Sequence, residues 1–228
     1  MDKNKISNNL YFDGVTKEYD ILETFDYNLS SAFIVNTHDF WVYFLCDNKN
    51  DLINLLEITS EKYKHFAAVE DWMKVIIEKK YQIDWIIDSF EYVYDNETII
   101  HKDNIFSEKL ETEDAAYIFN SLGNKKEYTI KYLEDRIKCD VSAGIKIDGE
   151  LAAWGLTNDD GTIGFLYVKE KYRNKGYAAD ILRSLILQKE EKGEKTILNV
   201  LKGNTKSNNL MKKLKFKYTR DIYWIKIK

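Results

Sequence analysis

The chain has 228 residues, of which 44% are hydrophobic and 14% aromatic, so it can bury a substantial core in one large or two small globular domains. Its formal net charge of -4 gives no reason to expect nucleic acid as the main partner. No apolar run approaches the ~20 residues of a membrane helix, and the polar first residues do not resemble a signal peptide. We expect a cytoplasmic protein without a membrane partner.

The cysteines and histidines are scattered along the chain. Cys46 and Cys139 lie far apart and have no neighbours at metal-ligand spacing, which favours thiols in a reducing compartment over a disulfide. His38, His65 and His101 form no His-x-x-x-His pair. We therefore expect no metal site.

The first hundred residues carry no catalytic motif. Aromatic and β-branched runs predict strands at residues 19–27 and 31–47, and a polar turn then leads into a helix that begins near Leu52. Helical spacing predicts a second helix over residues 64–87, followed by a strand over 91–100. The aromatic side chains of this half are expected in its core rather than in a ligand pocket: Trp41, Trp72, Trp85, Tyr92 and Tyr94. The sequence predicts a domain boundary between residues 103 and 104.

The second half shows a longer series of elements. A strand is expected over residues 105–110, and Thr112 is the expected N-cap of a first helix, which a second helix follows through residues 130–137. The Asp148-Gly149 pair between two apolar runs predicts a hairpin, and a further turn leads into a third antiparallel strand that ends at Val168. After a helix come a strand at 196–201, a short helix and one or two strands to residue 227.

Residues 165–187 are the most informative stretch. An apolar strand feeds a basic turn that contains Gly176, and Ala178, Ile181 and Leu182 begin an amphipathic helix. The first amides of a helix have no partner within it, and the helix dipole favours negative charge there, so the turn can cradle a phosphate. A glycine near a helix start is also common without any ligand, and this stretch alone leaves both readings open.

The spacing Arg173-x-x-Gly176-x-Ala178 resembles the acyl-coenzyme A pyrophosphate loop of the GNAT-type N-acetyltransferase superfamily, Arg/Gln-x-x-Gly-x-Gly/Ala. The order of elements over residues 105–228 is similar to that family's topology. With Trp154, Tyr167 and the loop, the chain resembles the glycine N-acyltransferase-like branch most. Proteins of that branch tend to carry a degenerate GNAT-like N-terminal domain, which would suit residues 1–103. The resemblance implies an α/β (α+β) fold with a mixed, mostly antiparallel sheet flanked by helices, and a catalytic domain over residues 104–228.

The resemblance also implies a set of coenzyme-binding residues. The strand before the loop would hold the thioester and the pantetheine arm, the loop amides would bind the pyrophosphate, and the segment after the next strand would add two polar side chains. For these last two, helix capping is an equal alternative. The set is Phe165, Leu166, Tyr167, Val168, Arg173, Asn174, Lys175, Gly176, Tyr177, Ala178, Asn204 and Ser207.

The catalytic positions depart from the family pattern. Thr162 stands at the usual position of the general base and Met211 at that of the general acid, and neither side chain can do that chemistry near neutral pH. The catalytic residues are therefore unknown, and the substitutes to consider are Asp159, Asp160, Glu134, Asp135 and Tyr167.

The resemblance implies an acyl-coenzyme A-dependent N-acyltransferase. It would use acetyl-coenzyme A as co-substrate, without a metal, and transfer the acetyl group to a primary amine of a small molecule or amino acid by direct attack in a ternary complex. The alternative is a catalytically degenerate coenzyme A-binding module with a sensing or assembly role. A nucleotide-binding fold is disfavoured, because residues 143–168 read as consecutive hairpins. The acceptor and the oligomeric state stay open.

Overall fold

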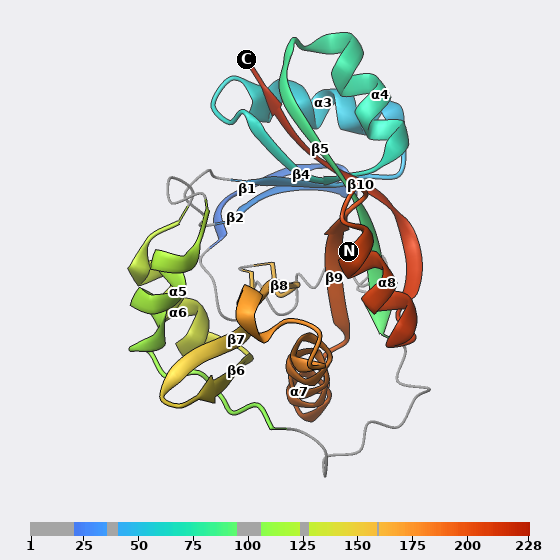
Figure 1. The fold of residues 1–228 in the computed structure, drawn as a ribbon. Helices are drawn as coiled ribbons and strands as arrows, with labels where there is room; N and C mark the ends of the chain where they lie inside the picture. Colours follow the sequence, from blue (N-terminus) through green and yellow to red (C-terminus); the bar gives the residue numbers. More distant parts are fainter. Residues whose placement is uncertain (1–20, 36–40, 95–105, 124–127, 159) are drawn as a thin grey trace. The chain divides into compact units, whose positions relative to one another are not determined.

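The computed structural model describes residues 21–35, 41–94, 106–123, 128–158 and 160–228 (Figure 1). Its contacts divide the chain into two compact units: Met1–Glu91 with Val200–Asn204 and Thr219–Lys228, and Tyr92–Asn199 with Thr205–Tyr218. The expected boundary at residues 103 and 104 lies outside the described residues, so a division into 1–103 and 104–228 stays a prediction. None of the described helices is long and apolar enough to cross a membrane.

The first unit holds a mixed sheet and two helices. Its strands lie in the order β1-β2-β3-β4-β10-β5. In chain order its elements are β1 (Ile21–Tyr27), β2 (Ser30–Val35), β3 (Val42–Leu45), α3 (Lys49–Ser60), β4 (His65–Val69), α4 (Asp71–Lys80), most of β5 (Ile83–Tyr94) and most of β10 (Lys217–Ile227).

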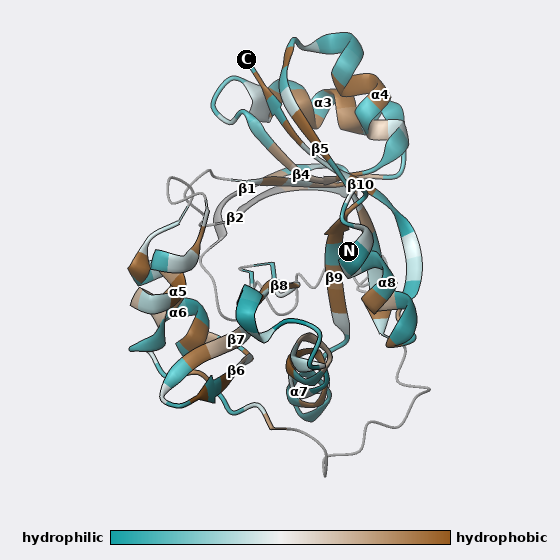
Figure 2. Cartoon of the chain, viewed as in Figure 1, coloured by the Kyte–Doolittle hydropathy of each residue, from teal (hydrophilic) through white to brown (hydrophobic). Residues whose placement is uncertain are grey.

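One face of this sheet packs against α3 and α4, whose surfaces are part hydrophobic and part hydrophilic (Figure 2). Asn48 caps α3 by accepting a hydrogen bond from the Asp51 amide. Buried side chains of both helices meet those of β3, β4 and β10 in one cluster that includes Leu52, Leu55, Met73, Ile77, Val42, Phe66 and Ile225. Burial of this apolar area is what holds the two helices on the sheet.

The predicted helix over residues 64–87 is wrong at both of its ends. The segment forms strand β4, helix α4 and the start of strand β5, so it is helical over Asp71–Lys80. Phe66 and Val69 lie in β4, which pairs with β10 on one side and with β3 on the other. Ala68 has a positive φ of 49°, and the register with β10 shifts at this point of the strand. Tertiary pairing decides between two patterns that a short apolar run satisfies equally.

The second unit is built on the strand order β9-β8-β7-β6. In chain order its elements are the end of β5, α5 (Asp114–Ser121), α6 (Ile130–Cys139), β6 (Ser142–Ile147), β7 (Glu150–Thr157), β8 (Ile163–Val168), the short 3-10 helix η2 (Glu170–Tyr172), α7 (Tyr177–Glu191), most of β9 (Thr196–Leu201), α8 (Thr205–Lys213) and the start of β10. Strands β6, β7 and β8 are antiparallel, and β8 pairs with β9 in parallel.

The hairpin at Asp148-Gly149 is confirmed. It joins β6 to β7, and its two residues have positive φ angles of 51° and 76°, as a tight two-residue turn between twisted strands requires. Strand β7 then separates two layers of helix. Trp154 and Leu156 belong to the core cluster with α5 and α6, whereas a Cβ on Gly155 would meet Ile181 and Leu185 of α7.

Two predictions at the start of this half are wrong. Residues 106–110 form no strand beyond an isolated bridge between Glu108 and Gly144, because the amides of Phe106 and Ser107 donate to the Asp180 carboxylate instead. Thr112 is not the N-cap of α5: Glu113 takes that position, and the Thr112 carbonyl accepts a hydrogen bond from the Ala115 amide.

Candidate functional site

The loop between β8 and α7 has the conformation of an anion cradle. Gly176 caps α7 with φ 86° and ψ -4°, in the left-handed region, and Asn174 also has a positive φ of 63°. No side chain caps the helix at Gly176. The amides at the start of α7 thus stand at a helix N-terminus, where backbone donors and the helix dipole both favour an anion.

Gly176 has open space where a side chain would begin, since a Cβ there would meet no atom within 4 Å. The glycine is therefore required by its backbone conformation, and its lack of a side chain leaves the helix start open to a ligand. The acidic residue of this first turn, Asp180, is buried and accepts hydrogen bonds from the Phe106 and Ser107 amides at 3.0 Å and 3.1 Å. Its carboxylate is thus already bound within the unit.

The basic side chains of the loop hold its shape. Arg173 donates from Nε to the Val168 carbonyl at 3.2 Å, which ties the loop back to the end of β8, and Lys175 Nζ lies 5.6 Å from the centre of the Tyr172 ring. These cations add a positive field to the helix N-terminus.

Strand β8 itself departs from regular pairing. Phe165 has a φ of 49°, and the register with β7 shifts between Trp154 and Leu156, which marks a β-bulge. The parallel pairing with β9 is recorded at Ile163 and Leu198, near the start of the strand. Beyond it, the side chains of residues 165–168 are partly exposed or exposed, with Tyr167 at 38%. An extended ligand can pair with such a segment as a strand would.

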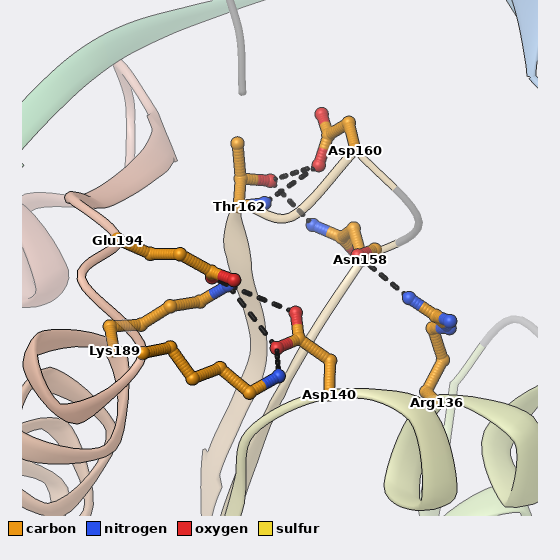
Figure 3. Close-up of polar contacts among 8 residues, drawn as sticks. Arg136, Asp140, Asn158, Asp160, Thr162, Lys189 and Glu194 are labelled. Atoms are coloured by element: carbon orange, nitrogen blue, oxygen red, sulfur yellow. Dashed lines mark hydrogen bonds and ion pairs between the residues drawn. The ribbon is translucent and has the colours of Figure 1, made fainter. Parts of the chain in front are cut away.

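Thr162 and Met211 occupy structural positions. Thr162 Oγ1 donates to Asp160 Oδ1 at 2.6 Å and accepts from Asn158 Nδ2 at 3.1 Å, and the Thr162 amide donates to the same Asp160 oxygen at 2.9 Å (Figure 3). Met211 is 1% exposed. These surroundings support a role in the turn for Thr162 and in the core for Met211.

The other candidate acids and bases are dispersed. Asp160 is buried in the same turn, Glu134 and Asp135 lie on α6, and Tyr167 stacks on Trp154 with ring centroids 4.7 Å apart. Asp159 lies outside the described residues. Of the expected coenzyme set, residues 165–168 and 173–178 lie close together in the chain, at the end of β8 and in the loop, whereas Asn204 belongs to the first unit and Ser207 to α8 of the second. The roles of Asn204 and Ser207 stay predictions.

A buried ion cluster at the C-terminal end of α7, the opposite end from Gly176, was not foreseen from the sequence. Lys189 of α7 lies 3.0 Å from Asp140 Oδ2 and 2.6 Å from Glu194 Oε2 (Figure 3). Lys192 lies 2.9 Å from Asp140 Oδ1. Burial opposes ionisation of Asp140, but the charge of Lys189 and the hydrogen bonds from Lys192 and Lys189 hold the pKa of Asp140 below its usual value. The cluster ties the end of α6 to the end of α7.

Glu150 was also missed, because nothing in its sequence neighbourhood marks it. Its carboxylate accepts from Lys169 at 2.6 Å and from the Tyr172 hydroxyl at 3.0 Å, and it also pairs with Lys171. Hydrogen bonds from Lys171 and Tyr172 lower the pKa of Glu150. Glu150 therefore holds the segment that leads from β8 into the loop. In the described part of the chain, no group of three or more His, Cys, Asp or Glu side chains could hold a metal ion.

Comparison with known proteins agrees with this geometry at the level of the fold. The model of one family, described as FR47-like protein, matches residues 144–225. A Drosophila protein of known structure aligns with a TM-score of 0.71 at 20% identity, over 87% of this chain and 74% of its own. A GCN5-related N-acetyltransferase from Kribbella flavida aligns with a TM-score of 0.61 at 10% identity, over 98% of this chain and 94% of its own.

An acetyltransferase of the GNAT family from Colwellia psychrerythraea gives a TM-score of 0.57 at 14% identity, over 90% of this chain and 84% of its own. No curated protein matches the chain in sequence. The chain thus has the GNAT fold, a mixed α/β architecture with a sheet flanked by helices, and the predicted fold class is confirmed. At these identities the likeness defines the fold, and the glycine N-acyltransferase-like branch stays a prediction.

Proposed function

We propose that the chain is an acyl-coenzyme A-dependent N-acyltransferase. It transfers the acetyl group of acetyl-coenzyme A to a primary amine of a small molecule or an amino acid, by direct attack of the amine in a ternary complex. The observation that carries the proposal is the open, left-handed Gly176 cap of α7 directly after the bulged strand β8. We further propose that the protein works in the cytoplasm.

The loop fits the pyrophosphate of the coenzyme. Backbone amides at the start of α7 would donate to the phosphate oxygens, and the open space in front of Gly176 leaves room for them. Arg173 and Lys175 would add positive charge. The proposed coenzyme-binding residues remain Phe165–Val168, Arg173–Ala178, Asn204 and Ser207.

Strand β8 fits the rest of the coenzyme. Among the described residues β8 pairs with β9 at Ile163 and Leu198, and past this pair the amides of an extended arm would bond to the strand backbone. The acetyl thioester would then lie near the bulge at Phe165, where the irregular backbone can direct an amide toward the carbonyl oxygen.

The chemistry asks little of acidic or basic side chains. The amine nitrogen attacks the thioester carbonyl carbon, the C–S bond breaks, the sulfur takes up a proton, and the nitrogen gives one up to solvent. Holding the two reactants together supplies up to about 7–11 kcal/mol of the barrier, and a backbone donor to the oxyanion adds to it. The surroundings of Thr162 and Met211 fit a mechanism that relies on this positioning.

A turnover assay tests the proposal. The purified chain is incubated with acetyl-coenzyme A and a panel of primary amines, and the free thiol of the product is measured. We expect thiol release that depends on an amine and that the loop variant Gly176→Asp lacks. Tight coenzyme A binding without thiol release for any amine would contradict the enzyme and favour the coenzyme A-binding module.

A further inference from the structure

Three aromatic rings gather on the exposed side of the bulge in β8. Phe165 meets Tyr128 with ring centroids 4.9 Å apart and Tyr132 with centroids 6.2 Å apart, and the two tyrosines are themselves 5.7 Å apart. Tyr128 precedes α6 and Tyr132 lies in its first turn. We call these three residues the aromatic triad. Each of its side chains is partly exposed.

The bulge explains why Phe165 reaches this position. A φ of 49° is rare for a bulky aromatic residue, and here it belongs to a residue that packs beside α6 rather than to a glycine. Its neighbour Leu166 points to the other side of the sheet, where Leu166 Cδ1 lies 3.6 Å from a Cβ built on Gly155 and α7 covers the strand. The two faces of β8 therefore differ: α7 covers one, and the other carries the partly exposed rings of the aromatic triad, of which Phe165 and Tyr132 also pack against the core cluster of α5 and α6.

The covered face restricts where an acceptor can approach. With α7 packed on the Leu166 side, a thioester lying along β8 is open to attack from the side of the aromatic triad. Tyr167 extends the aromatic surface on this side, because its exposed ring stacks on the buried Trp154. Aromatic rings bind other rings by stacking or edge contacts and bind organic cations over their faces.

We propose that the aromatic triad binds the ring of the acyl acceptor, so that the acceptor is an arylalkylamine or an amino acid with an aromatic side chain. The inference rests on the proposed function, whose acceptor it specifies. The triad takes no part in the bond changes. It holds the aromatic part of the acceptor while the amine nitrogen reaches the thioester carbon beside the bulge.

The test compares two probes that differ by a ring, 2-phenylethylamine and ethylamine. Each is titrated by calorimetry into the full chain, with and without coenzyme A. We expect the phenyl compound to bind at least about tenfold more tightly, and Tyr132→Ala to reduce its affinity roughly three- to tenfold. Tyr132→Phe should keep the preference, because the ring remains.

Two controls separate ring recognition from damage to the fold. Tyr218→Ala removes a 54% exposed ring on β10 in the same unit and should change nothing. Phe165→Leu serves as a second variant should Tyr132→Ala fail to fold by circular dichroism, and it should lower the preference as well. Equal affinity for the two amines, or an unchanged preference in the folded triad variants, would overturn the inference.

Failure of the aromatic-acceptor inference can be told apart from failure of the proposed N-acyltransferase function. If the unaltered chain binds no coenzyme A, the proposed function fails, while the amine titration without coenzyme still reports the ring preference. If instead benzoyl-coenzyme A is bound more tightly than acetyl-coenzyme A and the same variants remove that difference, the triad serves the acyl group and the inference is overturned.

Discussion

The two ends of strand β8 use their polar groups in opposite ways. At its start, Asn158, Asp160 and Thr162 bond to one another within a buried turn, and Arg136 donates to the Asn158 carbonyl at 3.1 Å. At its end, Gly176 opens a helix whose first amides have no side-chain cap and whose cap position faces open space. The polar groups at the first end bond within the fold, and the backbone amides at the second end are the donors that we propose bind the coenzyme.

The polar groups at the two ends of β8 therefore have different roles. Thr162, at the start of the strand, forms hydrogen bonds with Asp160 and Asn158. The helix start in the loop, by contrast, has no side-chain cap. We therefore expect changes in the buried turn to alter stability without altering binding, and changes at the loop to alter binding more than stability.

The largest effect is expected from the buried ion cluster. Asp140→Ala removes the buried carboxylate that pairs with both Lys189 and Lys192, and leaves the Lys189 charge, whose side chain is 2% exposed, with Glu194 as its remaining partner. We expect a loss of about 3–5 kcal/mol in the free energy of unfolding, measured with urea. Lys192→Ala, at a more exposed partner of the same carboxylate, should cost about 1 kcal/mol or less. Equal losses in both variants would contradict this account.

Gly176→Asp should have the next largest effect, on binding. Aspartate tolerates the left-handed conformation better than most residues, but its charge would stand where the phosphates bind. We expect coenzyme A affinity to fall by about 100-fold or more, equivalent to about 2.7 kcal/mol. Stability should fall by about 1–2 kcal/mol, because the left-handed backbone is strained for any residue other than glycine. Gly176→Asn is the matched neutral control and should lose far less. If both variants bind as the natural chain does, the loop assignment fails.

Thr162→Val tests the start of β8. It removes a hydroxyl that both donates to Asp160 and accepts from Asn158 in a buried turn, so we expect a loss of roughly 1–3 kcal/mol in stability. Coenzyme A affinity and turnover per folded molecule should stay as they are. A slower turnover in a stable variant would instead indicate that the hydroxyl orients a reacting water.

Lowering the pH should have a smaller effect on stability, through protonation of Asp140. The pKa of Asp140 is lower in the folded chain than its usual value of about 3.9, so its ionised form stabilises the fold at pH values above that usual pKa. The contribution is lost as the pH falls through the folded-state pKa. Stability curves of the natural chain and of Asp140→Asn should therefore converge below about pH 4. If the two stability curves stay parallel down to low pH, ionised Asp140 does not stabilise the fold.

Much of the second unit could be predicted from the sequence, because its signals are local. Asp148-Gly149 needs two positive φ angles, Gly176 needs one, and the apolar spacing of α7 runs for four turns. The segment over residues 64–87 could not be predicted, because its apolar residues fit a helix and a strand equally and pairing with β10 decides.

The part of the candidate site formed by the loop backbone could be predicted from the sequence. The part formed by side chains far apart in the sequence could not. The Arg-x-x-Gly-x-Ala spacing identified the loop. The fixing of its entry by Glu150, and the meeting of Tyr128 and Tyr132 with Phe165, depend on contacts between residues 19–37 positions apart, which no local pattern records. The positive φ of Phe165 had no signal either, since glycine or asparagine is the usual marker.

The most direct test of the comparison is a titration of the ¹⁵N-labelled chain with coenzyme A, followed by NMR. The account predicts that the amide signals of Gly176, Tyr177 and Ala178 shift in a saturable manner, while those of Gly161 and Thr162 stay in place. Shifts confined to the Asn158–Thr162 turn, with the loop signals unmoved, would contradict it.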